Sequence, residues 1–160
     1  MYLNALEFLE EEREAWRAFE ALGELTDEQL DRPISEAHDW SGRDLIGHLI
    51  AWLDDALAAA RELAVGEQSD AMERSRREFA ARGDEINAEI HAAWRCLPLA
   101  EVRRRFRETP GELRGYLTVV PETRWLKHAK NLESFREETI EHYEDHADDL
   151  RAILAAAGVG

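Results

Sequence analysis

The sequence predicts an all-α protein, organised as an antiparallel four-helix bundle with short extra helical segments. Three observations support this prediction. The strong helix formers Ala, Leu, Glu and Arg dominate the composition. No long stretch alternates apolar and polar residues, and β-branched residues are sparse, which argues against strands. The helix-breaking residues fall in clusters, so they divide the chain into long amphipathic stretches with short connections, the pattern of a bundle.

Chain length and cysteine content point to one domain that needs no covalent staple. The chain has 160 residues, close to the usual domain size of about 100–150 residues. We therefore expect residues 1–160 to form a single domain. Its one cysteine, Cys96, excludes an intrachain disulfide, so the fold does not depend on an oxidising compartment.

Charge and hydropathy exclude several classes of partner. The formal net charge is −15, which disfavours nucleic acid and anionic membranes because both require a positive surface. The basic stretch 103–107 is interpreted as a solvated helix face. Charged residues and His48 interrupt the most apolar stretch, residues 45–65, so no membrane span is expected. The first residues lack the features of a signal peptide, and the cytoplasm is the expected location.

The first half of the chain contains the clearest helix signals. A helix is predicted over residues 2–22, ending near Gly23, and a short helical turn over residues 27–30. The next long helix begins after Ser41, where Asp44 completes the spacing of a capping box. It is predicted to continue to about Val65 and to end at Gly66. The first helix has a broad apolar arc, which predicts a homodimer.

The second half is predicted to hold a helix in two pieces and a last helix. The pieces cover residues 70–95 and 99–117, separated at Pro98, and Pro110-Gly111 predicts a break inside the second piece. A connection that includes Trp125 follows. The last helix is predicted to begin with a capping box at Ser134 and Glu137 and to run to about residue 157.

Two histidines project from the inner face of the predicted last helix. Helical residues advance by about 100° each, which places Phe135, Leu150 and Ile153 within one core-facing arc. His146 lies inside that arc, and His142 lies about 20° outside its edge. A histidine pair at i and i+4 presents both rings on one face and suits chelation of one divalent ion. Surface histidines at this spacing are also common, so the pair alone does not establish a site.

His48 lies at the edge of the apolar stripe of the helix that begins after Ser41. It could be a boundary histidine that makes one hydrogen bond. Bundles, however, build metal sites from side chains on facing helices. We therefore predict that His48, His142 and His146 bind one divalent metal, leaving open positions for water or substrate. The other histidines (His38, His91 and His128) are expected to be exposed or at the rim. Cys96 is expected to be a buried or half-buried, inert thiol.

Several further residues are candidates for a small-molecule pocket near the histidines. Trp16, Trp52 and Trp125 could line it, although core packing is the more common use of tryptophan. Glu12 and Arg13 fall within the apolar arc of the first helix, where polar groups must either pair or face a wet cavity. The expected partner is a small-molecule substrate or ligand.

Two segments resemble signatures of the DinB-like superfamily. The segment from Trp40 to Trp52, WSGRDLIGHLIAW, resembles the second-helix signature, in which Trp, a small hydroxyl N-cap, Asp and His recur at this spacing. The segment from Glu138 to His146, ETIEHYEDH, is similar to the last-helix signature. The stretch 86–102 is similar to the middle of the ClbS/DfsB branch. The resemblance covers nearly the whole chain.

The resemblance implies a four-helix bundle that binds a divalent metal, nickel or zinc in many members, through His48, His142 and His146. Relatives include thiol-dependent transferases and isomerases, and a resistance hydrolase that acts on a reactive genotoxin. Two functions therefore stand side by side. One is a metal-dependent transferase or hydrolase that acts on a thiol-linked or electrophilic substrate in detoxification or stress response. The other is a non-catalytic bundle that sequesters a small ligand, in which the histidines are structural or pocket residues.

Overall fold

The computed structural model describes residues 1–159, and it confirms the all-helical prediction. These residues contain no β-strand; a single isolated bridge joins Ile34 and Trp40. None of the helices in this part of the chain is long and apolar enough to cross a membrane. In chain order, the elements are α1 (Ala5–Arg17), η1 (Ala18–Glu24), α2 (Asp27–Asp31), η2 (Ser35–Ala37), α3 (Gly42–Val65), α4 (Asp70–Arg95), α5 (Leu99–Val119), η3 (Glu122–Arg124), α6 (Ala129–Glu138), α7 (Ile140–Asp145) and α8 (Ala147–Ala156).

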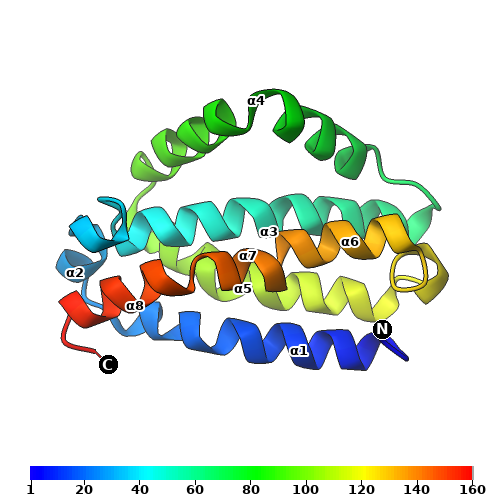
Figure 1. Cartoon of the computed structure of the whole chain (residues 1–160), viewed down its shortest axis with the longest axis horizontal. Helices are drawn as coiled ribbons and strands as arrows, with labels where there is room; N and C mark the ends of the chain where they lie inside the picture. Colours follow the sequence, from blue (N-terminus) through cyan, green and yellow to red (C-terminus); the bar gives the residue numbers. More distant parts are fainter. Residues whose placement is uncertain (160) are drawn as a thin grey trace.

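Helices α1, α3 and α5 lie alongside the row formed by α6, α7 and α8 (Figure 1). Helix α3 is central, since it packs against α4, α5, α6 and α8. Helix α4 arches over α3 and carries the chain back along it, so α3 and α5 run in the same direction (Figure 1). The antiparallel order predicted from short connections therefore does not hold for this pair, because a 26-residue helix serves as the connection.

Local sequence signals explain the bounds of α3. The Ser41 side chain accepts a hydrogen bond from the Asp44 backbone, and the Asp44 carboxylate accepts one from the Ser41 backbone, so the predicted capping box is confirmed. The helix ends at Gly66, as predicted. At Gly47 the missing side chain is essential, because a Cβ there would lie 2.6 Å from Trp94 Cγ. Gly47 thus lets the end of α4 dock against α3.

Two predicted features of the outer helices differ in the structure. The first helix is α-helical only to Arg17 and continues as the 3₁₀ helix η1. The predicted break at Pro110-Gly111 is absent, because α5 continues through Pro110. The Pro110 side chain is buried, and this packing offsets the one backbone hydrogen bond that a proline removes.

The predicted last helix is a row of three short helices. It begins at Ala129, where His128 is the N-cap and accepts a hydrogen bond from the Asn131 backbone. Ser134 lies inside α6 and is not the cap; its hydroxyl accepts a hydrogen bond from Arg76 instead. The row breaks at Thr139 (φ −124°, ψ −99°) and at His146 (φ −104°, ψ 10°). Neither break contains the glycine or proline that would have predicted it.

Candidate metal centre

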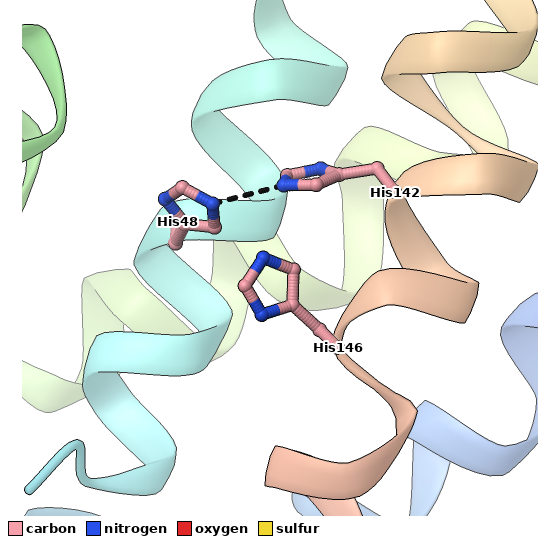
Figure 2. A group of neighbouring side chains, drawn as sticks. All are labelled: His48, His142 and His146. Atoms are coloured by element: carbon pink, nitrogen blue, oxygen red, sulfur yellow. Dashed lines mark hydrogen bonds between the residues drawn. The ribbon is translucent and has the colours of Figure 1, made fainter. Parts of the chain in front are cut away.

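His48, His142 and His146 lie together between α3 and the α6–α8 row (Figure 2). His48 comes from α3, His142 from α7, and His146 from the junction of α7 and α8. One ring nitrogen from each histidine lies within 4.8 Å of the other two. The Nε2 atoms of His48 and His142 are 2.9 Å apart, and a ring nitrogen of His146 faces the same space (Figure 2). The predicted grouping of the three histidines is therefore present.

An acidic residue orients the third histidine. Asp149 Oδ2 lies 2.9 Å from His146 Nδ1, and Asp149 is buried. An ionised carboxylate can only accept a hydrogen bond, so it favours the tautomer in which His146 Nδ1 carries the hydrogen and Nε2 offers its lone pair. The other oxygen of Asp149 lies 3.0 Å from His38 Nδ1. Asp149 thus connects the η2 loop to the centre.

Two indole rings restrict the positions of the imidazoles. Trp52 stacks on His142 with ring centroids 3.9 Å apart, and Trp40 stacks on His146 with centroids 5.5 Å apart. Trp40 also packs against His48 at 5.0 Å. Large rings in contact with all three histidines limit their rotation, which reduces the reorganisation needed to bind a ligand.

The protonation states of the two most buried histidines suit metal binding. Burial, with a smaller contribution from the neighbouring imidazoles, lowers the pKa of His48 to about 3 and that of His142 to about 2. Both rings are therefore neutral at physiological pH, which is the form that binds metal. Each also has a buried Nδ1 without a hydrogen-bond partner among residues 1–159. Three convergent imidazoles fit a divalent first-row ion such as zinc or nickel.

The five predicted pocket residues are divided between different parts of the fold. Trp52 lies at the centre, as described above. Glu12 and Trp16 of α1 contact Tyr143 of α7. Glu12 accepts hydrogen bonds from the Tyr143 hydroxyl (2.9 Å) and from Arg114 (2.5 Å), and Trp16 packs against the Tyr143 ring.

The other two pocket candidates lie away from the histidines. Arg13 lines a separate cavity of about 410 Å³ between α1, η1 and α5, which Trp16 also borders. Trp125 is fully buried in the core, where it packs against Phe8 and Phe135.

Besides Trp40, sequence reasoning missed three neighbours of the centre. Asp149 follows His146 by three residues, a helical spacing that could have identified it. His38 is exposed, as expected, yet it lies within hydrogen-bond distance of Asp149. Cys96, predicted to be buried or half-buried, is exposed. His91 is half-buried; it packs against Trp40 and lies 3.5 Å from Asp44 Oδ1. The position of His91 depends on how α4 folds back over α3, which no local signal predicts.

The fold and the histidine centre define an all-helical protein with a candidate three-histidine metal site. The family model described as "Mycothiol maleylpyruvate isomerase N-terminal domain" matches residues 9–134, more than half of the chain. The chain therefore belongs to this family, which is part of the DinB/YfiT-like helical superfamily. The match includes His48, whereas His142 and His146 lie beyond its end. No curated protein and no solved structure matches the chain.

Proposed function

We propose that this chain is a divalent-metal-dependent enzyme that uses a small thiol, of the mycothiol class, to modify an electrophilic or thiol-linked substrate. The convergence of His48, His142 and His146 is the observation that carries the proposal, because three imidazole ligands leave further coordination positions open. The family description adds the thiol, since it names mycothiol. We also propose that α1, α3, α5 and the α6–α8 row form a DinB-like four-helix bundle, in which α4 connects α3 to α5.

Each residue of the centre has a defined part in this proposal. His48, His142 and His146 would hold the ion, Asp149 would orient His146, and Trp40 and Trp52 would restrict the ring positions. When bound, a divalent ion supplies Lewis-acid chemistry and lowers the pKa of a thiol or water beside it. The low pKa values of His48 and His142 keep protons from competing for these two rings near neutral pH.

A second chemistry at the same centre is hydrolysis of an electrophilic substrate. The resemblance of residues 86–102 to the ClbS/DfsB branch favours this alternative, because that branch includes a resistance hydrolase. Residues 86–95 of this segment lie in α4, whose His91 packs beside Trp40 at the centre. The two chemistries would share the ion and differ in the nucleophile, a thiol in one and water in the other.

A thiol-transfer assay separates these proposals. The zinc-loaded and nickel-loaded proteins are incubated with an electrophilic bimane, with and without mycothiol, and conjugate and hydrolysis product are both quantified. We expect thiol-dependent conjugation that is lost in His142→Ala while the circular dichroism spectrum stays helical. The matched control is His128→Asn, which removes an exposed histidine but retains an N-cap acceptor for α6. Hydrolysis without thiol would support the alternative; conjugation that persists in His142→Ala would refute metal catalysis.

A further inference from the structure

A second cavity, of about 210 Å³, lies where α3, α4 and α6 meet. Trp52 of α3 lines this cavity and also stacks on His142, so one indole borders both the cavity and the histidine centre. Phe79 of α4 packs edge-on against Trp52 with ring centroids 4.6 Å apart. The cavity therefore has an aromatic wall that separates it from the three histidines.

Two buried polar atoms of the residues that line this cavity have no hydrogen-bond partner within residues 1–159: Glu138 Oε2 and Trp52 Nε1. Glu138 is only 9% exposed, and burial raises its pKa to about 8. A buried polar group without a hydrogen-bond partner destabilises the structure. A ligand that donates to Glu138 and accepts from the indole N–H would remove this cost at both atoms.

The charges around the cavity indicate the sign of the missing partner. Asp55 and Glu137 also line the cavity, and each carries a carboxylate. Arg76 is the only cationic residue among those that line it, and its guanidinium is already engaged. It donates to Ser134 Oγ at 2.7 Å and also to Glu73 and to the Lys130 carbonyl. The cavity thus brings together three carboxyl groups and one guanidinium, and the hydrogen bonds of that guanidinium go to other groups.

We propose that this cavity binds a small organic ammonium ion that also carries a hydroxyl, such as a short amino alcohol. The ammonium group pairs with Glu138 and with the carboxylate of Asp55. The hydroxyl oxygen accepts from Trp52 Nε1–H, and Phe79 contacts the methylene groups. Such a ligand satisfies both unpartnered atoms and supplies the missing positive charge. The proposal goes beyond the proposed function, because binding here requires no metal ion and no thiol.

Three probes of similar size and different charge test the proposal: ethanolamine, ethylene glycol and glycolate. Binding is measured by calorimetry and by ligand-detected NMR at pH 8 on the full chain after treatment with EDTA, so that coordination to a metal cannot contribute. We expect ethanolamine to bind more tightly than ethylene glycol by about tenfold or more, and glycolate not to bind. Equal binding of ethanolamine and ethylene glycol would overturn the proposal, whatever the outcome at the histidine centre.

Matched variants locate the binding. Glu138→Gln keeps the shape of the side chain and removes its charge, and it should weaken ethanolamine binding by about tenfold or more. Glu133→Gln is the control, because Glu133 is exposed on the same helix and does not line the cavity. Trp52→Phe removes the N–H donor and keeps an aromatic wall, and it should also weaken binding. Unchanged affinity in both Glu138→Gln and Trp52→Phe would contradict the proposal.

Discussion

The two walls of the histidine centre are built in different ways. On one side, His48 lies on α3, a 24-residue helix with a capping box at its start and a glycine at its end. On the other side, His142 and His146 lie on a row that breaks at Thr139 and His146. Helix α3 is specified by its own sequence, whereas the broken row is held in place by contacts from other elements. The geometry of the centre therefore depends on long-range contacts mainly on its second side.

The largest expected effect is on the free energy of unfolding, at the buried ion pair that Glu12 forms next to α7. Glu12 is 1% exposed and joins Arg114 to the Tyr143 hydroxyl. Glu12→Ala leaves Arg114 and Tyr143 without their partner, which should cost about 3–5 kcal/mol of unfolding free energy. Urea unfolding measures this change. A loss below about 1 kcal/mol would show that this contact does not hold the broken row.

The next prediction concerns how the stability of the fold changes with pH because of Glu138, which lies on the broken row. Burial, with a contribution from the charge of Asp55, raises the pKa of Glu138 in the folded state to about 8, above its usual value of 4.5. Between these values the folded state binds more protons than the unfolded state, so stability falls as pH rises.

Glu138→Gln cannot titrate, so its stability relative to the wild type should increase from pH 5 to pH 9. Since one pKa unit corresponds to about 1.4 kcal/mol, the gain should be on the order of a few kcal/mol. Urea unfolding at both pH values measures it, and Glu133→Gln should show no such trend. A constant difference between Glu138→Gln and the wild type would contradict the assignment.

A smaller effect is expected where Asp149 supports the third ligand. Asp149→Asn keeps the size of the side chain but removes the charge that favours one tautomer of His146. Loss of such a supporting contact typically weakens metal affinity about 10–100-fold. Competition with a chromophoric chelator measures the change. Asp148→Asn, a neighbouring exposed position, is the control, and an equal effect in both variants would refute a specific role for Asp149.

The smallest expected effect is on α3, the regular helix that carries His48. Ser41→Ala removes one half of the α3 capping box and should cost about 1 kcal/mol of stability. Metal affinity should change little, because His48 lies almost two turns into the helix and is held by packing as well. Thermal unfolding and chelator competition together measure both quantities. If Ser41→Ala weakened metal binding more than Asp149→Asn does, the geometry of the centre would depend mainly on α3 and not on the broken row.

The same contrast explains what could be predicted from sequence. The limits of α3 and the inward faces of His48, His142 and His146 follow from local rules: a capping box, a terminal glycine and helical periodicity. The breaks at Thr139 and His146 contain no glycine or proline, the residues from which a break is usually predicted. The packing of His91 and the link from His38 to Asp149 join residues far apart in the sequence. Contacts of this kind depend on how α4 and η2 dock, which the sequence pattern does not specify.

The central claim is that the three histidines form one metal site, and metal content tests it most directly. Mass spectrometry is applied to tag-free protein reconstituted at neutral pH, with the wild type beside a His48/His142/His146 triple alanine variant. We expect close to one zinc or nickel ion per wild-type chain, and none in a variant that remains helical. A wild-type protein that takes up no metal, or a triple variant that retains it, would show that the three histidines do not form a metal site.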